Sequence, residues 1–142
     1  MNKLKCYKVT IIIILKGNHL LSLLFFELLK YINDKENVFF GEFQGEKYIT
    51  HYYIDFLYKD KIIEFQGDIF HANPKIFNEN DEPNPFNNMK SKEIWIKDKT
   101  KINFLNKNKF KVLEVWENDF LLNKQDVVNN CLLFLKGGDA IC

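Results

Sequence analysis

The stretch that decides the fold reads IDFLYKDKIIEFQGDIFH and runs from Ile54 to His71. Within and just before it, Tyr52–Tyr58 and Lys61–Gln66 are rich in the aromatic and β-branched residues that favour strands. Lys59-Asp60 is the only polar break between these two runs. The pattern therefore predicts a β-hairpin with a tight turn at Lys59-Asp60 and an acidic residue in the middle of each strand.

The hairpin register sets Asp55 directly opposite Glu64, with Gln66 on the same face two residues further on. Cross-strand partners have Cβ atoms roughly 4.5–5.5 Å apart, and carboxylates that close repel each other unless a cation lies beside them. Mg²⁺ is held by one or two carboxylates with water and phosphate oxygens. We therefore expect Asp55 and Glu64 to bind Mg²⁺, or Mn²⁺ in its place, as in a metal-dependent phosphodiesterase. The alternative is that both acids lie on the wet face of a half-exposed strand.

Length and composition indicate one globular domain. The chain has 142 residues, 46% of them hydrophobic, and a net charge of +1. All 20 basic residues are Lys, which removes the bidentate contact of Arg with guanine. The three cysteines form no CxxC pair, so we expect reduced thiols in the cytoplasm. The apolar run Val9–Leu15 is far too short to span a bilayer, and no membrane association is expected.

Periodicity and turn residues predict an α/β fold, a small mixed β-sheet flanked by helices. We expect an atypical leader over 1–19, a single domain over 20–136 and a tail over 137–142. A proline-rich loop is expected at His71–Asn88, and the apolar strand Phe110–Trp116 is expected in a buried central position. The other expected elements are helices at Leu20–Ile32, Ser91–Asn106 (capped by Ser91) and Phe120–Leu135 (capped by Asn118 or Asp119), with strands at Val38–Phe43 and Lys47–Thr50.

Other chemistry-bearing residues lie around the hairpin. His71 follows the second strand where the long loop begins, and His can act as a general base at neutral pH. Asp98 lies on the inward stripe of the Ser91–Asn106 helix, where it can partner His71 or the metal; an i,i+3 pair with Lys101 is the alternative. We assign Lys97, Lys99 and Lys101 of this helix, with Asn73 of the loop, to DNA binding.

Four separated segments resemble the catalytic domain of the nucleases related to the very-short-patch mismatch-repair (Vsr) endonuclease, a family that includes phage- and intron-associated homing endonucleases. They are the strand Asp55, the segment from Gly67 to His71, the helical Asp98 and the closing VWE at Val115-Trp116-Glu117. The resemblance implies a restriction-endonuclease-like core of the PD-(D/E)xK type and Mg²⁺-dependent DNA cleavage. It also implies a catalytic Glu on the first helix, where the nearest acid is Glu27.

The two related patterns assign different partners to Asp55. Under the Vsr-like pattern Asp55 binds the metal, while His71 and Asp98 handle protons. Under the broader pattern Asp55 and Glu64 bind the metal, and Gln66 positions the water. We therefore expect a nicking or homing-type DNA endonuclease of a phage or mobile element, acting in the host cell as a homodimer or with a targeting partner. The alternatives are a catalytically impaired DNA-binding remnant and an acidic-patch protein-interaction domain.

Overall fold

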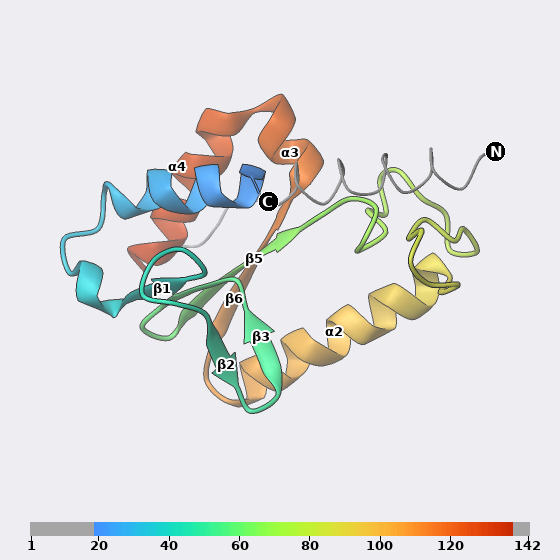
Figure 1. Ribbon diagram of the computed structural model, residues 1–142, viewed down its shortest axis with the longest axis horizontal. Helices are drawn as coiled ribbons and strands as arrows, with labels where there is room; N and C mark the ends of the chain where they lie inside the picture. Colours follow the sequence, from blue (N-terminus) through green and yellow to red (C-terminus); the bar gives the residue numbers. More distant parts are fainter. Residues whose placement is uncertain (1–18, 138–142) are drawn as a thin grey trace.

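The structure is a computed structural model that describes residues 19–137, so most of the predicted leader and tail lie outside the described residues. A helix over 19–29 opens the described chain. The elements that follow are η1 (Lys35–Asn37), β1 (Val38–Phe40), β2 (Lys47–Ile49), β3 (Tyr52–Ile54), β4 (Phe56–Tyr58), β5 (Lys61–Gln66), α2 (Ser91–Lys107), β6 (Lys111–Trp116), α3 (Glu117–Leu122) and α4 (Lys124–Leu135). The predicted mixed α/β arrangement, a small sheet between helices, is confirmed (Figure 1).

The main sheet has four strands in the order β1-β4-β5-β6, and β2 with β3 forms a separate ribbon. β1, β4 and β5 are antiparallel neighbours, and the predicted hairpin register is confirmed, with Tyr58 opposite Lys61. β6 pairs in parallel with β5 after the long loop and α2. Parallel strands require a crossover of this kind, and here α2 is the covering helix.

The prediction that the last strand is central was wrong, because β6 lies at the edge of the sheet. The two central strands are β4 and β5, and in β5 every residue from Ile62 to Gln66 is buried. The sequence of β6 is as apolar as that of a central strand because helices cover both of its faces. Its outer edge nevertheless has no neighbouring strand among the described residues.

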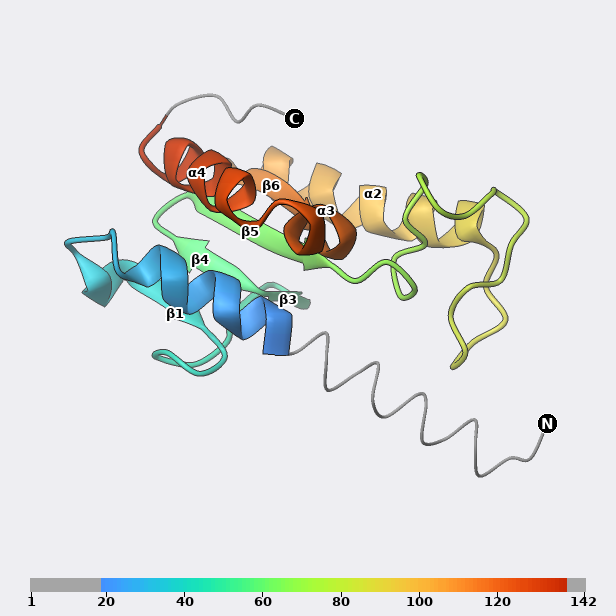
Figure 2. The ribbon, with the colours of Figure 1, turned by 90° about the horizontal axis from the view of Figure 1, so that it is seen from above.

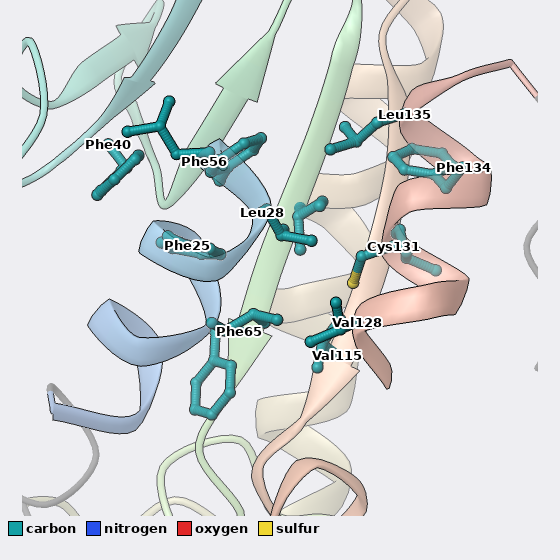
Figure 3. Close-up of a cluster of buried hydrophobic side chains, with 14 of the residues drawn as sticks. Phe25, Leu28, Phe40, Phe56, Phe65, Val115, Val128, Cys131, Phe134 and Leu135 are labelled. Atoms are coloured by element: carbon teal, nitrogen blue, oxygen red, sulfur yellow. The ribbon is translucent and has the colours of Figure 1, made fainter. Parts of the chain in front are cut away.

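Two apolar clusters lie on opposite faces of the sheet, because successive residues of a strand point to opposite sides. On one face Ile63 and Phe65 of β5 pack against the first helix and α4, and Figure 3 shows Phe25, Val128 and other members of this cluster. On the other face Ile62 packs against Leu105 of α2. The sheet is thus the middle of three layers (Figure 2).

Helix boundaries differ from the predictions where side chains make other bonds. Lys90, not Ser91, is the N-cap of α2; its backbone N–H donates to Glu93 Oε2 at 2.7 Å, while Ser91 Oγ donates to the Asp81 carbonyl at 3.3 Å. The predicted last helix is two helices, α3 and α4. They separate at Asn123, whose side chain caps α4.

Two further predictions concern the loop and the membrane. Residues 67–90 contain no helix or strand, which confirms the predicted loop. Within residues 19–137, no helix has the length and apolar character needed to cross a bilayer.

Candidate active site

The alternation of β5 turns Ile62, Glu64 and Gln66 toward α2, and the hairpin register brings Asp55 beside Glu64. Asp55 belongs to no strand; it forms a bend between β3 and β4. Its Oδ2 accepts a hydrogen bond of 2.9 Å from the backbone N–H of Phe65. In a regular strand pair the Phe65 N–H would donate to a backbone carbonyl of the neighbouring strand. Here it donates to the side chain of Asp55 instead.

The two carboxyl groups have raised pKa values. Burial raises the pKa of Glu64 to about 7, and the negative charge of Asp55 adds to this effect. Burial also raises the pKa of Asp55, against the lowering effects of the Phe65 N–H and of the charges on Lys101 and His71. Glu64 is only 5% exposed, so it is an acid in an apolar setting rather than on a wet strand face, while Asp55 beside it is half-buried. Strong pKa perturbation of clustered groups is a mark of functional sites.

Lys101 is the cation that the cluster contains. Its Nζ donates to Glu64 Oε2 at 2.7 Å and to the Tyr53 carbonyl at 2.7 Å. The helix thus turns Lys101, which we assigned to DNA binding, toward the buried carboxylates, and that assignment stays a prediction. The alternative pairing of Lys101 with Asp98 does not form. Lys97 and Lys99 are exposed on α2.

Gln66 and Glu114 extend the polar row to the edge strand. Gln66 Nε2 donates to Glu114 Oε1 at 3.0 Å; since a carboxylate only accepts, this contact fixes which end of the amide is the oxygen. Gln66 Oε1 and Glu64 Oε1 are both buried, and neither has a hydrogen-bond partner among the described residues. Glu114 was missed by sequence reasoning. The parallel register, which sets Glu64 beside Glu114, is the signal that finds it.

The predicted partnership of His71 and Asp98 is confirmed. His71 Nδ1 lies 2.8 Å from Asp98 Oδ2, and both side chains are partly exposed. Trp95, one turn earlier on α2, donates from Nε1 to the Ala72 carbonyl at 2.6 Å and so holds the loop that carries His71. A hollow of about 210 Å³ opens between His71, Trp95, Asp98, Glu114 and Trp116. Glu114 lines this hollow and also accepts the hydrogen bond from Gln66, so it lies between the His71–Asp98 pair and the polar row of β5.

Asn73 and Glu27 lie apart from this site. Asn73 is 1% exposed; its Nδ2 donates to Asp68 Oδ1 at 2.8 Å and its Oδ1 accepts from Lys75 N–H at 3.0 Å. Both ends of the Asn73 amide are therefore hydrogen-bonded inside the loop, and the assignment of Asn73 to DNA binding stays a prediction that this burial does not support. Glu27 pairs with Lys30 at 2.7 Å, which lowers the Glu27 pKa, and no hydrogen bond or ion pair links it to the described site residues.

The atoms that this site could offer to a cation are oxygens. Nowhere in residues 19–137 do three His, Cys, Asp or Glu side chains lie close enough together to hold a metal ion, so neither a structural zinc site nor any other site with three such ligands is formed in this part of the chain. Mg²⁺ needs fewer protein ligands and prefers oxygen. The unpartnered oxygens of Glu64 and Gln66, with Asp55 beside them, provide such a set.

Comparisons with protein-family models, curated proteins and solved structures find no match to this chain. The resemblance to the Vsr-like nucleases consequently stays a prediction from the quoted motifs.

Proposed function

We propose that this protein is a Mg²⁺-dependent DNA endonuclease with a restriction-endonuclease-like core. One observation carries the proposal: two buried acceptor oxygens, Glu64 Oε1 and Gln66 Oε1, have no donor among the described residues, and both belong to the face of β5 that lies beside Asp55. A buried acceptor left unsatisfied costs about 1–3 kcal/mol. A bound cation removes this cost for both oxygens together.

Asp55, Glu64 and Gln66 would hold the ion, which is Mg²⁺ or, in its place, Mn²⁺. When bound, the metal would supply positive charge to the scissile phosphate and lower the pKa of a water molecule. Lys101 keeps one oxygen of Glu64 hydrogen-bonded, and so leaves the other oxygen for the ion.

His71 would act as the general base. In the tautomer whose Nδ1 proton is donated to Asp98, Nε2 has a lone pair that accepts a proton from the attacking water. Asp98 holds the ring in this tautomer and orientation. Lys97 and Lys99 are exposed on the same helix and would bind the flanking phosphates.

The resemblance adds the biological setting to the proposal. It places the enzyme in the cytoplasm of a host cell as a product of a phage or mobile element, with a homodimer or a targeting partner providing specificity. A second candidate, a DNA-binding remnant with impaired catalysis, is favoured by the position of Glu27. Glu27, the nearest counterpart of the acid that the family places on its first helix, pairs with Lys30 and makes no hydrogen bond or ion pair with the described site residues.

The test uses supercoiled and single-stranded DNA, with Mg²⁺ or with EDTA, and four proteins: wild type, Asp55→Asn, Glu64→Gln and the control Asp60→Asn. Asp60 is an exposed acid in the turn of the same hairpin. We expect cleavage by wild type and Asp60→Asn in Mg²⁺ alone, and a loss of at least about 100-fold in the two site variants. Cleavage by Asp55→Asn at the wild-type rate would contradict the proposed site. DNA binding by a folded wild type without cleavage would favour the remnant.

A further inference from the structure

The outer edge of β6 presents unpaired backbone groups. The N–H of Lys111 donates to the Asp60 carbonyl at 2.8 Å, so the backbone of Lys111 points toward β5. The backbone N–H and C=O groups of successive residues point to opposite sides of a strand. Those of Leu113 and Val115 therefore point toward β5, and those of Val112 and Glu114 point away from it. No other strand of the described chain lies on that side (Figures 1 and 2).

A groove of about 600 Å³ runs along this edge. The consecutive residues Val112–Trp116 form its base. Ile102 of α2 forms one apolar wall, and Leu122 of α3 with Val127 of α4 forms the other. Leu122 is 78% exposed, so its side chain is accessible from the groove.

The groove is lined by carboxylates although the whole chain carries a net charge of +1. Among the described residues, Glu114, Asp119 and Asp126 line it, and Lys75 is the one basic residue in its lining. Lys75 Nζ lies 3.6 Å from Asp119 Oδ1, and both side chains are largely exposed, so this pair is weak. The negative charge disfavours the phosphates of a nucleic acid and favours Lys or Arg side chains.

β6 has few of the features with which proteins protect an edge strand, since Lys111 and Glu114 are its only charged residues. It contains no Pro and no Gly, and its one Lys stands at the first position. Unprotected edges with free backbone groups pair readily with another strand.

We propose that this groove binds an extended polypeptide segment in which apolar residues alternate with Lys or Arg, and that the segment joins β6 as an added antiparallel strand. Backbone hydrogen bonds to Val112 and Glu114 would supply affinity, and the apolar walls and carboxylates would supply selectivity. This proposal does not depend on the nuclease activity.

The test uses a blocked peptide of alternating Lys and Val, seven residues long, with two matched peptides. In one, Glu replaces Lys; in the other, alternate backbone nitrogens are methylated so that one edge of the peptide cannot donate. Peptide binding is followed by tryptophan fluorescence. Protection of the β6 edge is followed by amide hydrogen exchange at Val112 and Glu114. We expect the Lys-Val peptide alone to bind and to slow exchange at both amides. The double variant Asp119→Asn/Asp126→Asn should weaken binding by roughly tenfold. The control Glu36→Gln/Glu82→Gln, which changes exposed acids outside the groove, should not.

Three outcomes would overturn the proposal. The folded protein binds no Lys-Val peptide; or the methylated peptide binds equally well, so that charge alone drives binding; or sedimentation shows a dimer whose Val112 and Glu114 amides are already protected, so that a second copy covers the edge.

Discussion

The charge state of Glu64 links proton binding at the site to cation binding. One of its oxygens is hydrogen-bonded to Lys101 at 2.7 Å, and the other is buried without a partner among the described residues. Burial and the neighbouring charge of Asp55 raise its pKa to about 7. The carboxyl group therefore changes its charge near neutral pH, and the binding of any cation there is tied to the loss of a proton.

The stability of the protein should depend on pH through this residue. The pKa of Glu64 rises from its ordinary 4.5 to about 7 on folding, so the folded chain retains a proton that the unfolded chain loses between these values. The stabilisation is full below about pH 4.5 and is lost as the pH rises through about 7. Mg²⁺ should therefore raise the melting temperature by roughly 5 °C or more at about pH 8, and hardly at all at about pH 5.5.

The check is thermal unfolding of wild type, Glu64→Gln and the exposed control Glu36→Gln at both pH values, with and without Mg²⁺. Glu64→Gln should lose this component of the pH dependence and the response to Mg²⁺ together. An equal response to Mg²⁺ in Glu64→Gln would remove Glu64 from the cation site.

At the scale of one element, α2 gathers the site. Trp95, Asp98 and Lys101 recur every three residues on it, and they contact the Ala72 carbonyl, His71 and Glu64 in turn. Periodicity predicted the inward direction of Trp95 and Asp98, because both lie on an apolar stripe. It could not predict Lys101, since a lysine in a basic helix looks solvated until a buried carboxylate is known to face it.

Trp95→Phe tests the role of α2 in holding the loop. The change keeps the aromatic ring but removes the donor to the Ala72 carbonyl, a bond of 2.6 Å, and should cost about 1 kcal/mol in the free energy of unfolding. Amide hydrogen exchange should quicken over 67–77 and stay unchanged in β1 and β4. Ile96→Ala, at a residue that is 68% exposed, is the control. Unchanged exchange in the loop of Trp95→Phe would show that the bond does not hold His71 in place.

At the scale of the whole molecule, the sheet separates two apolar clusters. Local signals were sufficient for the hairpin register, the loop and the existence of the main helices, because each depends on residues close in sequence. The parallel pairing of β5 with β6 depends on segments far apart, and periodicity carries no information about it. For this reason the edge position of β6 and the place of Glu114 beside Gln66 were not predicted.

Ile62 and Ile63 provide a direct test of this separation. They are neighbours in sequence, both fully buried, and belong to clusters on opposite faces of β5. Ile62→Val and Ile63→Val should each cost about 0.5–1.5 kcal/mol of unfolding free energy, and the double variant should show the sum. Chemical denaturation of wild type, the two single variants and the double variant gives the coupling free energy between the two sites. A coupling energy above about 0.5 kcal/mol would mean that the two clusters behave as one.

The bond between Lys101 and Glu64 joins residues 37 positions apart, and this separation has a consequence during synthesis. A ribosome makes the hairpin with both acids well before it makes the lysine that neutralises them. Until Lys101 is made, Glu64 lacks the ammonium group that pairs with it in the folded chain, so we expect the hairpin to be less stable than in the complete protein. Productive folding must therefore wait for the second half of the chain, and truncated translation products that end before Lys101 should be substrates for proteases.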